Sequence, residues 1–285
     1  MIVALNLRAR IITLALVTGL GCLWLLGPVL AAAPEAELWP RWQTHDQNSD
    51  LTLDHSVWGR FLKVFVKTDQ AGATWVDYRN IRPTDRAMLD AYIAYLEGVR
   101  TRRLNRDAQM AFWINLYNAL TVRLVFDHYP LKTIRDIDIS PGWFEDGPWG
   151  AKLATVDGQK LSLDEIEHRI LRPIWQDPRI HYAVNCASVG CPNLAPWAYT
   201  GARIDSQLDT AARSFVNHPR AVLVTGNGVQ LSSLFKWYAQ DFGDKDTNVL
   251  DHLRGYASSG LVSALSETTR INDYKYDWSL NDLRD

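Results

Sequence analysis

Residues 108–126 read AQMAFWINLYNALTVRLVF, and the expected fold follows from this stretch. Its polar side chains are few: Gln109, Asn115, Asn118, Thr121, Arg123 and the hydroxyl of Tyr117. A helix that is apolar on nearly all sides is expected to be buried at the centre of a protein. The sequence therefore predicts a long central helix over 107–128.

Further helices and strands are predicted before and after this stretch. Helical spacing of apolar residues occurs at 57–67, 84–99, 162–171, 205–217, 233–242 and 248–255. Strands are predicted at 73–78, 179–185 and 271–276, and a hairpin is predicted where 221–225 and 229–231 flank Gly226-Asn227-Gly228. Residues 140–159 are rich in Gly, Pro and Trp, which predicts a long ordered loop.

Strands that are scattered among helices, rather than alternating with them, are typical of α+β proteins. The prediction is an α+β fold, with a single helix-rich domain and a small, mostly antiparallel sheet around the long buried helix. A content of 47% hydrophobic and 22% charged residues is typical of a packed protein rather than a disordered one. The net charge of −2 argues against binding nucleic acid through its phosphates.

The N-terminus has the pattern of a secretory signal peptide. Arg8 and Arg10 precede an apolar run at 11–26, and a triplet of small residues ends at Ala33. A basic segment, an apolar segment and small residues at the cleavage point are the three parts of such a signal. Cleavage is expected after Ala33; the alternative is an uncleaved membrane anchor, because apolar residues continue to Leu30.

Three parts of the chain are therefore expected. Residues 1–33 are the signal peptide, 34–56 are an N-terminal arm or linker, and 57–285 are a single globular domain. Export would place the mature protein in the periplasm or outside the cell, where disulfides persist.

Two amides of the predicted central helix, Asn115 and Asn118, lie on one face, about 60° apart. Each needs a partner, because an unsatisfied buried polar group costs about 1–3 kcal/mol. They either bond loop backbone and stabilise the fold, which is the commoner arrangement, or orient a catalytic or ligand group.

A capping box, Ser162 with Glu165, predicts the start of a short helix. Glu167 falls on the apolar face of that helix, and a carboxylate there needs a partner or a raised pKa. The partner is an arginine such as Arg172 in a structural ion pair, or Glu167 takes part in catalysis beside His168.

The segment HYAVNCASVGCP, residues 181–192, contains two cysteines. A thiol at a strand end, such as Cys186, can have a lowered pKa and act as a nucleophile. His181 is the nearest base in sequence, but in a straight strand it would lie roughly 16 Å away on the opposite side. A direct Cys–His pair therefore needs a sharp bend or a different histidine, His168.

Three interpretations of this segment remain open. Export favours a Cys186–Cys191 disulfide. The second interpretation is a reactive Cys186 in a hydrolase or acyltransferase. The third is a metal site built from His181, Cys186, Cys191 and His168. The spacing Cys-x₄-Cys fits a zinc site only loosely, and we expect no metal and no cofactor.

Five motifs follow one another along the chain: AFWINLYNALT from Ala111, LSLDEIEHRILRP from Leu161, RIHYAVNCASVGCPNL from Arg179, LSSLFKWYAQDF from Leu231 and YDWSLND from Tyr276. Together they resemble a family known as domain of unknown function family 547. The resemblance covers about two-thirds of the chain after the expected cleavage point. It implies kinship with exported bacterial proteins and larger plant proteins of no known activity, so it assigns no catalytic residue.

The leading hypothesis is an exported thiol-dependent hydrolase or acyl or amide transferase. Cys186 would be the nucleophile, His181 or His168 the base, and Glu167 or Asp241 the group that orients the base. The residues expected to bind or orient the substrate are Asn115, Asn118, Asn185, Ser188, Trp237, Tyr238 and Asp241. The three asparagine amides are candidate donors to an oxyanion.

The alternative is a non-enzymatic binding module of the cell envelope, stapled by a Cys186–Cys191 disulfide. In either case we expect the partner to be a small molecule, a peptide or a glycan, and not nucleic acid. Membrane contact is expected only through the N-terminal segment, if that segment is not cleaved.

Overall fold

The computed structural model describes residues 34–141, 147–226, 228–267 and 270–283. All of them belong to one compact unit, Ala33–Asp285. The predicted signal peptide, 1–33, lies outside the described residues. Within these ranges, no helix combines the length and the apolar character needed to cross a membrane.

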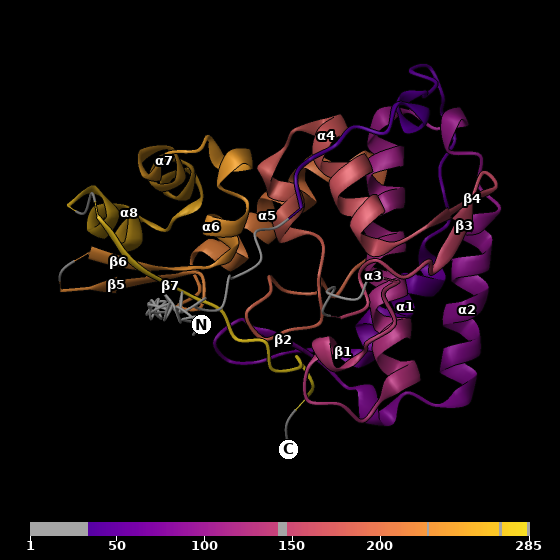
Figure 1. Ribbon diagram of the computed structural model, residues 1–285, viewed down its shortest axis with the longest axis horizontal. Helices are drawn as coiled ribbons and strands as arrows, with labels where there is room; N and C mark the ends of the chain where they lie inside the picture. The colour runs from indigo at the N-terminus through magenta and orange to yellow at the C-terminus, as the bar shows by residue number, and fades with distance from the viewer. Residues whose placement is uncertain (1–33, 142–146, 227, 268–269, 284–285) are drawn as a thin grey trace, which may run out of the picture. The chain divides into compact units, whose positions relative to one another are not determined.

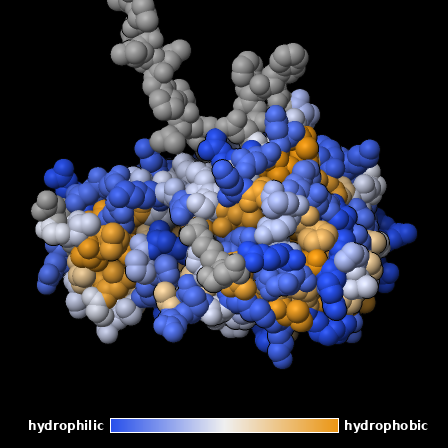
Figure 2. All heavy atoms as spheres, turned by 90° about the horizontal axis from the view of Figure 1, so that it is seen from below, coloured by the Kyte–Doolittle hydropathy of each residue, from blue (hydrophilic) through white to orange (hydrophobic). Residues whose placement is uncertain are grey.

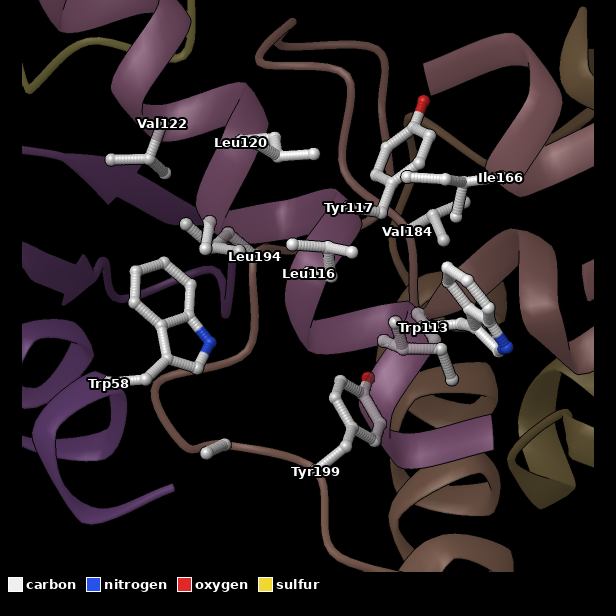
Figure 3. Close-up of a cluster of buried hydrophobic side chains, with 14 of the residues drawn as sticks. Trp58, Trp113, Leu116, Tyr117, Leu120, Val122, Ile166, Val184, Leu194 and Tyr199 are labelled. Atoms are coloured by element: carbon white, nitrogen blue, oxygen red, sulfur yellow. The ribbon is translucent and has the colours of Figure 1, made fainter. Parts of the chain in front are cut away.

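The predicted central helix is α3, Arg106–His128. It begins where the side chain of Asn105 accepts the backbone N–H of Ala108 at 2.9 Å, an N-cap that satisfies a free helix donor. Side chains on all faces of α3 are buried, as expected for a helix with so few polar residues. Figure 3 shows side chains from other segments that pack against it: Trp58, Ile166, Val184, Leu194 and Tyr199.

The helices enclose two hydrophobic cores. The first core surrounds α3 and includes α1 (Ser56–Phe65) and α2 (Pro83–Glu97). The second core is formed largely by four further helices: α5 (Ile204–Val216), α6 (Leu234–Trp237), α7 (Asp246–Tyr256) and α8 (Ser259–Ser266). Figure 1 shows α5 as the member of the second group that lies near α4 (Arg172–Trp175).

The strands form three small sheets in the described residues. Two are antiparallel pairs: β1 (Val66–Thr68) with β2 (Thr74–Val76), and β3 (Ala154–Val156) with β4 (Gln159–Leu161). In the third, β5 (Val222–Thr225) is antiparallel to β6 (Gly228–Ser232), and β6 is parallel to β7 (Ile271–Lys275). The predicted α+β class, rich in helix and mostly antiparallel in its strands, is confirmed.

The prediction of a strand at 179–185 is wrong. The segment begins as a 3₁₀ helix, Pro178–Tyr182, and then turns. Pro178 lacks a backbone N–H and favours the first turn of a helix. Asp177 caps this turn by accepting the N–H of Arg179 at 2.9 Å. Local capping and packing on α3 therefore prevail over the alternating pattern.

Other predicted elements differ in detail. The helix expected at 162–171 is mostly a π-helix, Glu165–Leu171, which continues into α4. The helix expected at 233–242 is divided into α6 and a 3₁₀ helix, Ala239–Phe242. The expected loop at 140–159 contains β3, and its residues 142–146 lie outside the described ranges. The pattern of the sequence did not predict α8.

The surface is a mixture of polar and apolar side chains. In Figure 2, apolar side chains form patches between hydrophilic ones. Large apolar side chains that are exposed include Val64, Met88, Leu223 and Val224. Scattered exposure of this kind is ordinary for folded proteins and does not indicate a function.

Gly201 and Gly59 provide a matched test of the packing around α3. A Cβ at Gly201 would lie 2.9 Å from the backbone nitrogen of Ala108, whereas a Cβ at Gly59 would meet no atom within 4 Å. Gly201→Ala should lower the free energy of unfolding by about 1–3 kcal/mol through overpacking. Gly59→Ala should raise it by about 0.5–1 kcal/mol, because Ala is the better helix former. Urea denaturation measures both, and equal effects would contradict this packing.

Candidate functional site

The Cys loop, residues 186–191 with the sequence CASVGC, follows the turn after the 3₁₀ helix. Asn185 fixes both ends of this loop. Its Oδ1 accepts the N–H of Ala187 at 2.9 Å, and its Nδ2 donates to the carbonyl oxygen of Pro192 at 2.7 Å. The buried amide of Asn185 therefore determines the shape of the loop that carries both cysteines.

Asn118 of α3 attaches this loop to the central helix. Its Oδ1 accepts the N–H of Asn185 at 2.8 Å, and its Nδ2 donates to the carbonyl oxygen of Ala183 at 2.9 Å. Asn115 bonds backbone in the same way, but at Tyr199, at 2.8 and 3.0 Å. The amides therefore bond loop backbone, the commoner of the two arrangements expected, and only Asn118 lies under the Cys loop.

The segment that follows β7 runs beside the Cys loop. The N–H of Gly190 donates to the carbonyl oxygen of Asp277 at 2.8 Å, and the N–H of Asn281 donates to that of Ala187 at 3.1 Å. A Cβ on Gly190 would lie 2.7 Å from the nitrogen of Asp277 and 2.9 Å from Cγ of Tyr276. Glycine is needed for this close approach, which brings Tyr276 next to Cys186.

The Cys186 thiol lies among hydroxyl groups. Its Sγ is 3.0 Å from the hydroxyl of Tyr276 and 3.2 Å from that of Ser188, and the two hydroxyls are 2.8 Å apart. The residue is half-buried. Cys186 is therefore held by one hydroxyl of its own loop and by one from far along the chain, and the residue as a whole is partly exposed.

The pKa of Cys186 is lowered from 9.0 to about 7. The largest cause is the hydrogen bond with the Cys191 thiol, which stabilises the thiolate. Burial opposes this effect, while the hydrogen bonds from Ser188 and Tyr276 add to it and the charge of Glu167 opposes it. At neutral pH a large fraction of Cys186 is consequently a thiolate, the nucleophilic form.

Cys191 is the buried partner of Cys186. Its Sγ accepts the backbone N–H of Cys186 at 3.0 Å. Burial raises the pKa of Cys191 well above its usual value. Both cysteines are free thiols, so the disulfide considered from the sequence is not formed in this structure.

A second polar group, the charged cluster, lies close by and consists of Glu167, His168, Arg172, His181 and Asp241. Asp241 is at its centre, because its carboxylate accepts a hydrogen bond from His181 Nε2 at 2.6 Å and two from Arg172 at 2.6 and 3.1 Å. His181 Nδ1 is 3.6 Å from Glu167 Oε1, and Arg172 Nη1 is 3.1 Å from His168 Nδ1.

The histidines predicted as bases therefore have other partners. Within the described residues, Cys186 Sγ hydrogen-bonds to the hydroxyls of Tyr276 and Ser188 and to no imidazole. His168 and His181 instead belong to the charged cluster.

The charged cluster keeps its carboxylates ionised. Burial opposes ionisation of Glu167, but the charges of His168, His181 and Arg172 lower its pKa to about 2. Burial likewise opposes ionisation of Asp241, and His181 and Arg172 outweigh it and lower its pKa. For His181 burial favours the neutral ring, but Asp241 and Glu167 raise its pKa. Arg172, the partner expected for Glu167, pairs with Asp241 instead; Glu167 lies 3.6 Å from His181, and its pKa is lowered rather than raised.

Tyr238 packs against the charged cluster. Its ring stacks on His181 with 4.0 Å between ring centroids, and the guanidinium carbon of Arg172 is 4.9 Å from its centroid. Burial is the chief cause that raises the pKa of Tyr238, and the charge of Glu167 adds to it. Because Glu167 also affects the pKa of Cys186, the two groups belong to one region.

Half-buried aromatic rings adjoin the thiol and form the aromatic surface: Trp149, Trp237, Tyr276 and Trp278. Tyr276 is 4.7 Å from both Trp237 and Trp278, measured between ring centroids. Trp149 lies 5.9 Å from Trp278. The same tyrosine therefore contacts the Cys186 thiol with its hydroxyl and the neighbouring rings with its face.

Sequence reasoning did not identify Tyr276 as a site residue. The motif YDWSLND begins at this tyrosine and could have pointed to it. Its contact with the Cys loop is long-range, however, and the sequence pattern does not reveal such a contact. Ser188, Tyr238 and Asp241 do lie in this region, as expected. In the described residues, no group of three or more His, Cys, Asp or Glu is arranged to hold a metal ion.

A hollow of about 160 Å³ lies elsewhere in the described part of the chain. Its lining includes Thr74, Asn193, Trp197 and Ser214. None of the predicted site residues lines it.

Comparison with protein families gives one match. Residues 101–216 match the family described as protein of unknown function, DUF547. The resemblance predicted from the motifs is thus confirmed, over a range that holds α3, the charged π-helix and the Cys loop. Tyr276 and the aromatic surface around it lie mostly outside that range. No curated protein and no solved structure matches the chain.

The hydroxyl of Tyr276 should control the reactivity of Cys186. The rate of alkylation by iodoacetamide should rise with pH around a midpoint near 7, because the thiolate is the reacting form. Tyr276→Phe should raise that midpoint by about one pH unit, through loss of one hydrogen bond to a charged group. Peptide mapping of Cys186 measures the rate at each pH.

Tyr274→Phe is the matched control, since Tyr274 lies on β7, two residues before Tyr276, and is not among the groups that shift the pKa of Cys186. It should leave the midpoint unchanged. An identical midpoint in wild type and Tyr276→Phe would contradict the role of the hydroxyl.

Proposed function

We propose that the chain is a thiol-dependent acyltransferase or hydrolase with Cys186 as its nucleophile. One observation carries the proposal: Cys186 is half-buried and has a pKa near 7, because hydrogen bonds from Cys191, Ser188 and Tyr276 stabilise its thiolate. A thiol that ionises at neutral pH and stays accessible has the properties of a catalytic nucleophile.

In the proposed reaction the Cys186 thiolate attacks the carbonyl carbon of an acyl donor. A thioester forms on Cys186, and the bond to the leaving group breaks as that group takes a proton. The acyl group then passes to water or to an amine. Tyr276 stays protonated, because burial raises its pKa, so its hydroxyl is a hydrogen-bond donor to charge that develops at the site.

The roles of the charged cluster differ from the initial hypothesis. His181 is held between Asp241 and Glu167, so we propose that these residues stabilise the site rather than deprotonate the thiol. Export through a signal peptide at 1–33, with action in the periplasm or outside the cell, remains part of the proposal.

Acylation by p-nitrophenyl acetate tests this function. The full chain should release p-nitrophenolate in a burst and retain an acetyl group on the peptide that contains Cys186. Cys186→Ser should slow the burst at least about 100-fold, because the nucleophile is lost. Cys22→Ser, which removes the remaining cysteine outside the site, should keep both burst and adduct. Acetylation elsewhere at an unchanged rate in Cys186→Ser would refute the proposal.

A second candidate function is binding alone, in the cell envelope, and the aromatic surface favours it. Half-buried tryptophans that contact one another offer flat apolar area together with polar N–H groups. Such a surface suits a sugar ring or an apolar peptide side chain.

Tryptophan fluorescence distinguishes this candidate. A soluble oligosaccharide or an apolar peptide should quench the emission of the wild-type chain with a saturable dependence on concentration. The double variant Trp237→Ala and Trp278→Ala should lose the saturable part and weaken binding by 10-fold or more, as for aromatic residues central to an interface. Equal affinities in both proteins would show that the surface is not a binding site.

A further inference from the structure

The two cysteines of the Cys loop lie next to each other but differ in their surroundings. Cys186 is half-buried, whereas Cys191 is only 5% exposed. Cys191 Sγ accepts the backbone N–H of Cys186 at 3.0 Å and lies 3.9 Å from the carbonyl oxygen of Val184, so the buried sulfur sits against the backbone of the residue that carries the outer one. Acyl transfer needs only one of these thiols, so the second thiol calls for a different chemistry.

We propose that Cys186 and Cys191 form a redox-active pair that reduces a disulfide bond of a substrate. This activity goes beyond acyl transfer, because the atom attacked is sulfur rather than acyl carbon. The outer thiol, Cys186, attacks the substrate disulfide. The inner thiol, Cys191, then resolves the mixed disulfide, the intermediate of thiol–disulfide exchange.

The reaction balances in two steps. The Cys186 thiolate attacks one sulfur of a substrate R–S–S–R, which forms Cys186–S–S–R and releases one R–S⁻. Cys191 then passes its proton to the released thiolate and attacks Cys186 Sγ, which forms the Cys186–Cys191 disulfide and releases the second R–S⁻. The protein loses two electrons, the substrate disulfide gains them, and an added dithiol restores the pair.

The structure prepares both steps. Burial raises the pKa of Cys191, and the neighbouring donors lower that of Cys186, so the outer thiol is the nucleophile at neutral pH. The hydroxyls of Tyr276 and Ser188 hold Cys186 Sγ from the other side. Cys191 is thereby kept close to the sulfur that it must attack.

The backbone of the Cys loop limits the movement needed to form the Cys186–Cys191 disulfide. Asn185 ties Ala187 to Pro192 across the loop, and the N–H of Cys191 donates to the carbonyl oxygen of Ser188 at 3.1 Å. Ala187 adopts a φ of 59°, a left-handed conformation that a residue with a side chain rarely takes. This turn folds the chain back and brings the sulfur of Cys191 to 3.0 Å from the backbone nitrogen of Cys186, five residues earlier.

Glutathione disulfide is the probe for the test. In the full chain carrying Cys22→Ser, only the two thiols of the Cys loop remain. One equivalent of glutathione disulfide should release two equivalents of glutathione and leave a Cys186–Cys191 cross-linked peptide without bound glutathione. The second release should proceed at a rate independent of the glutathione disulfide concentration, because that step is intramolecular.

Cys191→Ser should stop the reaction after the first step. One equivalent of glutathione should be released, and the other should stay on Cys186 as a mixed disulfide, which mass spectrometry detects. Cys186→Ser should react at least about 10-fold more slowly, because the remaining thiol is buried and protonated. Thermal unfolding of both variants checks that they fold, and the wild-type cross-link gives a readout without any variant.

Two results would overturn the proposal. One is a wild-type chain that keeps glutathione on both cysteines or on Cys186 without forming the cross-link. The other is equal release from wild type and Cys191→Ser. Either result is distinguishable from a failure of acyl transfer, because neither measurement involves an acyl donor.

Discussion

The geometry of the site depends on the buried amide of Asn118. A buried amide at the middle of the central helix α3 would lower the stability of the fold by about 1–3 kcal/mol if it had no hydrogen-bond partner. It is satisfied by the backbone of Ala183 and Asn185, on either side of Val184. The requirement to satisfy one polar group in an apolar helix thus fixes the turn that precedes Cys186. Asn185 then transmits that constraint to both ends of the Cys loop.

The acidity of the thiol has an unusual origin for this kind of site. In many thiol enzymes an imidazolium stabilises the thiolate, but here the hydrogen-bonding groups belong to Cys191, Ser188 and Tyr276. The positive charges of the region, on Arg172 and His181, are instead matched by Asp241 and Glu167. Removing one member of this buried cluster would leave an uncompensated charge and destabilise the fold by several kcal/mol. The charged side chains therefore pair with one another.

Much of the fold could be predicted from the sequence, because α3 is apolar throughout and the hairpin and helix signals are local. The segment 179–185 could not: its alternation fits a strand, but capping by Asp177 and bonding to Asn118 produce a 3₁₀ helix and a turn. The same difference matters for the site. A strand would separate His181 from Cys186 and leave the choice of its partner open, whereas in the structure His181 pairs with Asp241, sixty residues away. Contacts of that range, including Tyr276 with Cys186, leave no periodic trace in the sequence.

The charges around the site bear on the fate of an acyl group on Cys186. Hydrolysis needs a base to activate water, and a base must be unprotonated and free to accept a proton. His181 lies between two carboxylates that raise its pKa, and Glu167, with a pKa near 2, is a weak base. An amine or thiol acceptor brings its own nucleophile and needs less activation than water does. Within the proposed function, these charges therefore favour transfer of the acyl group over its hydrolysis.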